Sequence, residues 1–241
     1  MPSSNRVLIW DIPVRLLHLV LAGSISTALV LALGFEEKDP LFVYHTWFGL
    51  LAGGALAVRL VLGFVGSRYA RFSSWSFSPR ALIASVGSQL RGERSQPEAG
   101  HNPAASWVML GMLLLVGAVL GTGLAGGEDL HAVAAYALLA FIGLHLAGLA
   151  VHTVWHREPI ALSMLDGKKI TPDGVALPHA SPVMGLLVAL LLAGWGVLLV
   201  RGFDAAAGTM RLPFLAQPIS LMEDGEKGGG EAGHGAGRDA D

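Results

Sequence analysis

Cysteine is absent from this chain of 241 residues, and only 14% of the residues are charged. Without cysteine the chain cannot form disulfides, iron–sulfur clusters, thiolate metal sites or the thioether links of c-type haem. The charged fraction lies far below the roughly 25% of an average soluble domain. The net charge of −2 argues against nucleic-acid binding, which requires a basic surface. Both deficits point away from a soluble or nucleic-acid-binding protein.

Hydrophobic residues make up 53% of the chain and gather in long runs. A membrane-spanning helix needs about 20 mainly apolar residues. Five segments qualify, and they are residues 14–33, 43–65, 104–124, 130–155 and 183–200. The fold class is therefore predicted to be all-α, an integral membrane helical bundle. The polar connection 66–103 is expected to carry an interfacial helix around 79–90.

Three regions are expected along the chain. Residues 1–175 contain the first four spans and form a four-helix core, and residues 176–222 add a fifth transmembrane helix and an interfacial segment. Residues 223–241 are Gly-rich and acidic, so they bury too little apolar surface to fold and are expected to be disordered. The first span is expected to be retained rather than cleaved as a signal peptide, because Asp11 and Arg15 interrupt it.

Lys and Arg are unevenly distributed among the predicted loops, and loops rich in them stay on the cytoplasmic side of a membrane. The loops after the first and third spans hold one cation and five acids, namely Lys38 and then Glu36, Glu37, Asp39, Glu128 and Asp129. The loops after the second and fourth spans hold eight cations, namely Arg68, Arg71, Arg80, Arg91, Arg94, Arg157, Lys168 and Lys169. We therefore expect a cytoplasmic N-terminus and an external C-terminal tail.

The chain has nine histidines, and their positions relative to the spans are its most informative feature. Ionisable residues inside a membrane are costly and mark functional sites by default, although a single one is more often a hydrogen-bonded structural residue. His18 lies inside the first span, His45 opens the second, His131 opens the fourth, and His145 lies in its middle. From His131 to His145 the helix rises roughly 21 Å, and both side chains face one side of it.

The predicted topology pairs these histidines by depth in the membrane. His45 and His131 both lie near the external surface, and His18 shares the cytoplasmic half with His145. Two haem irons, each held by two neutral imidazoles, account for all four positions, because electron-transfer cytochromes fill both axial sites. Two stacked haems would also shorten the distance of each electron transfer across a bilayer core of about 30 Å. His152, one further position along the same helix face, stays open as an alternative ligand.

Other residues near the spans each allow two interpretations. Arg59, inside the second span, and Arg15, near the start of the first, could pair with haem propionates or extend to the membrane interface. Gly49, Gly53 and Gly54 lie at near-helical spacing in the second span. They could admit a flat macrocycle or pack neighbouring membrane helices together.

Four sequence blocks follow one another in a recognisable order. They are VLIWDIPVRLLH near the start, HTWFGLLAGGALAVRLVLGFVGSRYARF in the second span and its loop, GHNPAASWVMLGMLLLVGAVLGTGL in the third, and H-x13-H followed by HRE in the fourth. Together, over residues 7–169, they resemble the bacterial cytochrome b561 and nickel–iron hydrogenase-type b cytochrome family. The resemblance implies a four-helix haem-binding core with two non-covalent b haems. The implied ligands are His18, His45, His131 and His145.

The resemblance also implies quinone-linked electron transfer in the bacterial inner membrane. The GHNP segment is the best match for a quinone site beside the cytoplasmic haem, with Asn102 donating to a quinone carbonyl and His101 relaying a proton. Asn102 followed by Pro103 is equally typical of a helix start, with Asn as the cap and Pro in the first turn. The expected cofactors are two b-type haems, with quinone or quinol as the substrate.

The leading hypothesis is a membrane di-haem b-type cytochrome that transfers electrons between the quinone pool and a redox partner in a respiratory chain, with quinone/quinol oxidoreductase activity as an option. The partner would be a c-type cytochrome or a dehydrogenase or hydrogenase subunit. The hypothesis also allows the chain to form a homodimer. The alternative is a cytochrome b membrane anchor subunit of a hydrogenase- or dehydrogenase-like complex. A histidine-based transporter is disfavoured, because the sequence shows no internal repeat and no acidic residue in the middle of a span.

Overall fold

The computed structural model describes residues 6–91, 100–170, 176–204, 206–212, 215 and 217–221. Within these residues, five helices are long and apolar enough to cross a membrane, which confirms the predicted all-α membrane bundle. They are α1 (Ile12–Gly34), α2 (Val43–Val65), α4 (Pro103–Leu124), α5 (Glu128–His156) and α7 (Pro182–Gly202). The interfacial helix predicted over 79–90 is present as α3 (Pro79–Leu90). Arg94 and the predicted tail 223–241 lie outside the described residues.

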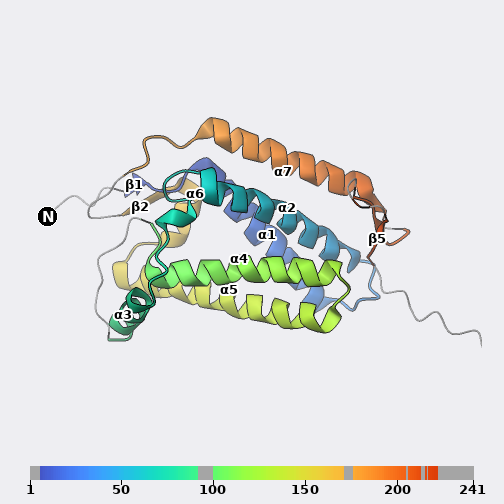
Figure 1. Cartoon of the computed structure of the whole chain (residues 1–241), viewed down its shortest axis with the longest axis horizontal. Helices are drawn as coiled ribbons and strands as arrows, with labels where there is room; N and C mark the ends of the chain where they lie inside the picture. The colour runs from blue at the N-terminus through green and yellow to red at the C-terminus, as the bar shows by residue number, and fades with distance from the viewer. Residues whose placement is uncertain are drawn as a thin grey trace, which may run out of the picture.

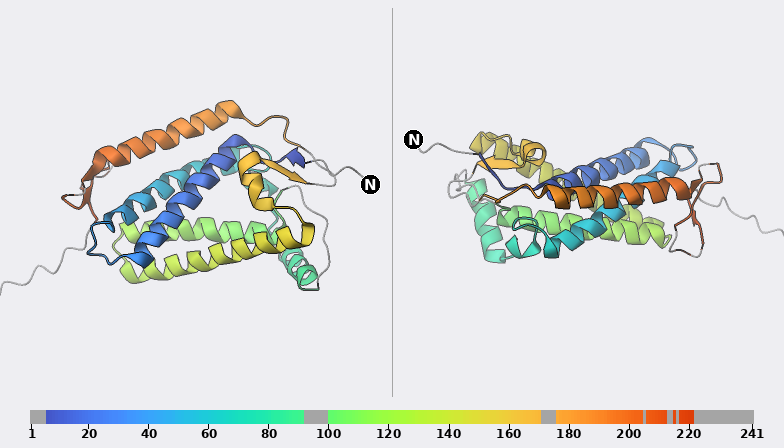
Figure 2. Two further views of the ribbon diagram at one scale, coloured as in Figure 1. Left: turned by 180° about the vertical axis from the view of Figure 1, so that it is seen from behind. Right: turned by 90° about the horizontal axis from the view of Figure 1, so that it is seen from above.

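The five long helices form two hairpins and an outer helix (Figure 1). Helices α1 and α2 pack along each other, and so do α4 and α5. The hairpins meet where α2 contacts α4, while α7 packs against α1 and α2 on the side away from α4 and α5 (Figure 2). A small apolar cluster of Leu56, Val116 and Leu138 joins α2, α4 and α5 midway along the bundle.

The starts of three helices are fixed by capping side chains followed by proline. Asp11 accepts a hydrogen bond from the Val14 amide at the start of α1, and Ser78 accepts one from Ala81 at the start of α3. Asn102 caps α4 in the same way. Such caps satisfy amide groups that have no partner inside the helix, and proline in the first turn needs no such partner.

The two ends of the bundle differ in charge. We call one the basic end, because its loops carry Arg68, Arg71, Arg157, Lys168 and Lys169. The other is called the acidic end, because Glu36, Glu37 and Asp39 lie in its loop after α1, and Glu128 and Asp129 lie in the first turn of α5. The basic end also holds the short elements η1 (Phe72–Ser74), η2 (Ile160–Leu162) and α6 (Ser163–Asp166), and α3 packs there against α4.

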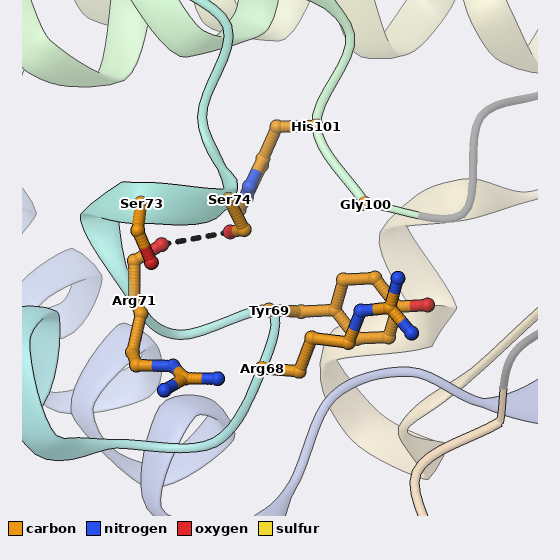
Figure 3. Close-up of a pocket in the computed structure, with 7 residues that line it drawn as sticks. All are labelled: Arg68, Tyr69, Arg71, Ser73, Ser74, Gly100 and His101. Atoms are coloured by element: carbon orange, nitrogen blue, oxygen red, sulfur yellow. Dashed lines mark hydrogen bonds between the residues drawn. The ribbon is translucent and has the colours of Figure 1, made fainter.

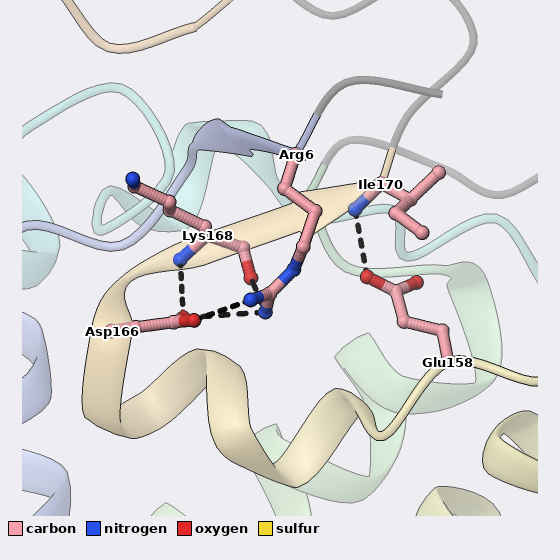
Figure 4. A network of polar contacts seen from close by, with 5 residues as sticks. All are labelled: Arg6, Glu158, Asp166, Lys168 and Ile170. Atoms are coloured by element: carbon pink, nitrogen blue, oxygen red, sulfur yellow. Dashed lines mark hydrogen bonds and ion pairs between the residues drawn. The ribbon is translucent and has the colours of Figure 1, made fainter. Parts of the chain in front are cut away.

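A two-stranded antiparallel sheet ties the start of the chain to the loop after α5. Strand β1 (Arg6–Leu8) pairs with β2 (Lys168–Ile170), with Val7 opposite Lys169. The Arg6 guanidinium forms an ion pair with Asp166 and donates to the Lys168 carbonyl (Figure 4). Gly167 adopts a positive φ of 78°, and a Cβ there would lie 2.5 Å from the Trp10 carbonyl oxygen, so glycine is required at this turn.

A second small sheet caps the acidic end beyond α7. Its strands are β3 (Phe203–Asp204), β4 (Thr209–Met210) and β5 (Ile219–Ser220), in the order β3-β4-β5 and all antiparallel. Its apolar side packs against the first turns of α2 in a cluster of buried residues that includes Val43, Leu199, Met210 and Leu221. The predicted fifth helix is therefore anchored to the core at its far end.

The outward surface of the long helices is strongly apolar. Exposed side chains include Val30 on α1, Phe64 on α2, Val133 on α5 and Val183 on α7. Such a surface is stable in contact with lipid chains and not in water. The protein is a multi-pass membrane protein.

Candidate functional site

One histidine pair lies at the acidic end, between α2 and α5. His45 is in the first turn of α2 and His131 in the first turn of α5. The centroids of the two imidazole rings are 5.9 Å apart, and the ring planes are inclined by 81°. Two imidazoles bound on opposite sides of one metal ion need a centroid separation of roughly 6 Å. Each metal–nitrogen bond is about 2 Å long, and the distance from each bonding nitrogen to its ring centre makes up the rest. The pair therefore has the spacing of two axial ligands.

Backbone carbonyls fix the protonation of both rings in this pair. The Nδ1 atom of His45 lies 2.9 Å from the Ala28 oxygen of α1, and the Nδ1 atom of His131 lies 2.9 Å from the Val119 oxygen of α4. A carbonyl oxygen can only accept, so each Nδ1 must carry the proton. The lone pair of a neutral imidazole is then on Nε2, the tautomer that a haem iron binds.

Gly123 makes room for the His131 ring. A Cβ added at this position would lie 2.9 Å from His131 Nδ1, which is too close for the ring to remain in place. Gly123 lies four residues after Val119 on α4, directly beside the carbonyl that His131 uses. Gly123 could not be identified from the sequence, because small residues are common in membrane helices and nothing in the local pattern marks this one.

The second histidine pair lies between α1 and α5, nearer the basic end. His18 is two turns into α1, and His145 is in the middle of α5. The two imidazoles are close enough to interact electrostatically, and His145 also interacts with His101. The His18 side chain is exposed to the surface, and the His145 side chain is half-buried. The structure thus brings together the same four histidines that the sequence singled out, as two pairs.

His152 turns toward the loop after α5. Its Nε2 atom lies 3.5 Å from a carboxylate oxygen of Glu158, which is only 3% exposed. The other Glu158 oxygen accepts a hydrogen bond from the Ile170 amide of β2 at 2.7 Å (Figure 4). His152 therefore belongs to the contacts that hold β2 against the end of α5.

Arg59 lies inside α2 within a group of aromatic side chains. Its guanidinium carbon is 5.1 Å from the centre of the Phe72 ring and 5.4 Å from that of Trp75. With His101 and Trp10, these residues form what we call the Arg59 cluster. Among the described residues, the buried Nη1 atom of Arg59 has no hydrogen-bond partner. A buried guanidinium nitrogen of this kind fits a carboxylate such as a haem propionate.

His101 is enclosed at the basic end between two tryptophans. Its ring centroid lies 4.7 Å from that of Trp10 and 5.6 Å from that of Trp75. Although the residue as a whole is half-buried, its Nδ1 atom is fully enclosed and has no partner among the described residues. Burial, together with the smaller effects of the charges of Lys169, Arg59 and His145, lowers the pKa of His101 to about 3. His101 is therefore neutral at physiological pH.

Asn102 follows His101 and caps α4. Its Oδ1 atom accepts a hydrogen bond of 2.7 Å from the Ala105 amide. The helix-start interpretation of this residue is thus realised, and the bond uses only the oxygen of the side chain. The amide nitrogen is the group that would donate to a ligand.

The three glycines of α2 differ in what they face. A Cβ on Gly54 would collide with the Trp195 ring of α7, and one on Gly53 would press on Leu120 of α4. These two residues serve helix packing. Only at Gly49, one turn after His45, would a Cβ meet nothing within 4 Å, so it remains the candidate for close approach of a macrocycle.

A family model described as prokaryotic cytochrome b561 matches residues 9–167 of the chain. No curated protein matches the chain, and neither does any solved structure. The matched region contains α1, α2, α4 and α5 and both histidine pairs, and histidine is a common ligand of haem iron. The chain belongs to the prokaryotic cytochrome b561 family and is a membrane b-type cytochrome that binds haem.

Proposed function

We propose that this cytochrome holds two b haems and transfers electrons between a quinone at its basic end and a redox protein at its acidic end. The proposed ligands are His45 and His131 for the acidic-end haem, and His18 and His145 for the basic-end haem. The observation that carries the proposal is that α5 contributes one histidine to each of two pairs, at depths separated by roughly 21 Å.

Each haem, when bound, supplies reversible one-electron exchange at its iron. The chain's own residues keep the ligands ready for it. The Ala28 and Val119 carbonyls hold the His45 and His131 rings with Nε2 free to bind. Arg59 offers its unpartnered nitrogen to a propionate at the basic end. His145 is the proposed partner of His18 because His152 is engaged with Glu158.

The quinone is proposed to bind where Asn102 and His101 meet. The Asn102 amide nitrogen donates to a quinone carbonyl, while its oxygen continues to cap α4. The proposed role of His101 is to relay a proton to or from the quinone through its neutral ring, which has a donor on one nitrogen and an acceptor on the other. His101 is close enough to His145 for the two rings to interact electrostatically, so a quinone at this position would lie near the proposed basic-end haem.

The basic end is proposed to face the cytoplasm of a bacterial inner membrane. Its loops carry the Lys and Arg excess, whereas the opposite loops are acidic. The acidic end then faces the periplasm, where a c-type cytochrome or a dehydrogenase or hydrogenase subunit is the proposed redox partner.

Haem counting tests this proposal directly. Purified protein, assayed as pyridine haemochrome, should contain two b haems per chain and should reduce them on addition of a quinol. The Asn102→Ala variant should keep both haems and lose quinol reduction. One haem per chain would overturn the two-pair assignment. Unchanged quinol reduction in the variant would overturn the quinone site.

A further inference from the structure

A polar cavity opens at the basic end, beyond the last turn of α2. It encloses about 450 Å³, within the range of small-ligand sites. Its walls come from the segment after α2 and from the residues just before α4 (Figure 3). They are Arg68, Tyr69, Arg71, Ser73, Ser74, Gly100 and His101.

The lining of this cavity is suited to an anion. Arg68 and Arg71 contribute two guanidinium groups, and none of the seven described lining residues is acidic. A third cation lies next to the cavity. The Lys169 ammonium group donates a hydrogen bond of 3.2 Å to the carbonyl of Gly100, which is one of the lining residues. The Ser73 hydroxyl is a further donor on the wall, whereas the Ser74 hydroxyl already donates to the Arg71 carbonyl at 2.7 Å (Figure 3). Guanidinium and hydroxyl groups together are the donors that phosphate oxygens prefer.

A buried polar atom in the cavity lining, Nδ1 of His101, also indicates a ligand. His101 lines the cavity, and its Nδ1 atom is buried without a partner among the described residues. The imidazole is neutral and can donate or accept a hydrogen bond. Buried polar atoms are normally satisfied, so this atom indicates that the cavity takes a hydrogen-bonding group.

The surroundings place the cavity at the level of lipid headgroups. The last turns of α2 expose Val61, Phe64 and Val65, which are 59%, 75% and 69% accessible and face the bilayer. Arg68 follows Val65 after only two residues. Further along, α3 exposes Ile83 and Val86. Basic pockets bordered by membrane-facing surface on one side of a bilayer are suited to anionic headgroups.

We propose that this cavity binds a phosphate group, held by Arg68, Arg71 and the Ser73 hydroxyl. A phosphodiester of an anionic phospholipid is one source, with its acyl chains along α2, and a soluble phosphate compound is the other. The site shares His101 with the proposed quinone site but is separate from the four histidines proposed as haem ligands, so its occupancy does not depend on how many haems the chain holds.

The test compares lipid retention in matched variants of the full, haem-loaded protein. The protein is incubated with phosphatidylglycerol or phosphatidylcholine in detergent, and bound lipid is counted by native mass spectrometry. We expect preferential retention of phosphatidylglycerol. The variant Arg68→Gln/Arg71→Gln should weaken it about 25-fold, because each cation near an anionic headgroup contributes about fivefold. The variant Arg80→Gln/Arg157→Gln removes two basic-end charges outside the cavity and should retain the preference.

Two further arms identify the source of the phosphate. If inorganic phosphate binds and phosphatidylglycerol shows no preference, a soluble phosphate compound is the ligand and the phosphate site stands. Equal binding of both lipids and phosphate to the wild type and the Arg68/Arg71 variant would overturn the proposal. Haem loss in that variant, with Arg80→Gln/Arg157→Gln fully loaded, would also overturn it by assigning the arginines to haem. The haem content of the wild type, measured in the same samples, reports separately on the proposed function.

Discussion

At the acidic end, His45 and His131 each give an Nδ1 proton to a helix carbonyl, whereas the basic-end pair borders the charged and aromatic Arg59 cluster. Within the described part of the chain, His18 and His145 show no comparable bond to a carbonyl. A hydrogen bond at Nδ1 makes an imidazole a stronger electron donor to its metal. A nearby cation instead stabilises the reduced, more negative state of a haem.

The difference indicates that one set of ligand residues can serve two haems with different potentials. In the proposed two-haem arrangement, hydrogen bonding would lower the potential at the acidic end, and the Arg59 charge would raise it at the basic end. All four proposed ligands are histidines, so the groups around them would have to separate the two potentials. The following predictions test whether the two ends behave independently.

Loss of one ligand should have the largest effect and should be confined to one end. His131→Ala should remove the acidic-end haem and leave the basic-end haem, and His145→Ala should do the reverse. Each variant should therefore contain half the wild-type haem by pyridine haemochrome assay and keep a different component of the reduced spectrum. His179→Ala, which changes an exposed histidine outside the helices, is the control. Loss of both haems from either variant would show that the ends are not independent.

Crowding of His131 should weaken the acidic end alone. In Gly123→Ala the new methyl group would lie 2.9 Å from His131 Nδ1 and displace the ring from the Val119 carbonyl. Loss of such an outer contact typically weakens metal binding about tenfold or more. Haem titration of the apoprotein should show this at one of two sites. Gly117→Ala, where a Cβ meets nothing within 4 Å, should bind both haems normally. Equal binding by the two variants would refute the role given to Gly123.

Removal of the Arg59 charge should shift the basic-end potential. Arg59→Gln should lower the midpoint potential of that haem by an amount on the order of 50 mV, from Coulomb's law at intermediate dielectric. Spectroelectrochemical titration should find the acidic-end potential unchanged. Arg80→Gln removes an exposed charge from α3 and serves as the control. A shift of both potentials by the same amount would contradict the assignment of Arg59 to one end.

Acidification should weaken the basic end through His101. Its folded-state pKa of about 3 lies below the ordinary value of 6.5, so the unfolded chain binds more protons between these values. Stability from this group is complete above about pH 6.5 and declines as the pH falls toward 3. The melting temperature of the wild type should fall by a few degrees more than that of His101→Gln between about pH 7 and pH 5. If the melting temperatures of the wild type and the variant fell equally with pH, His101 would not be enclosed.

The sequence was sufficient to predict the spans and the pairing of the histidines. Apolar length marks each helix, and two histidines fourteen positions apart on α5 share one face whatever the neighbours are. The family assignment was also predicted and is confirmed. The individual ligand assignments, Arg59 and Asn102 remain predictions for the experiments above.

Other features could not be predicted because they depend on contacts between distant segments. Every residue has a carbonyl, so nothing in the sequence marks those of Ala28 and Val119 as partners of histidine. From the sequence alone, Gly54 could equally well allow close approach of a macrocycle or of a neighbouring helix. The structure shows that the Trp195 ring of α7 lies against it. The sheet from β3 to β5 is built from two-residue strands, too short for an alternating pattern.

The pairing of β1 with β2 has a consequence for how the protein is made. A chain emerges from the ribosome in order, so Arg6–Leu8 must wait until Lys168–Ile170 appears before it has a partner. By then α1, α2, α4 and α5 have all been synthesised, and both histidine pairs are complete. Closure of this sheet is therefore a late event in biogenesis, because it follows the synthesis of every helix that carries one of the paired histidines.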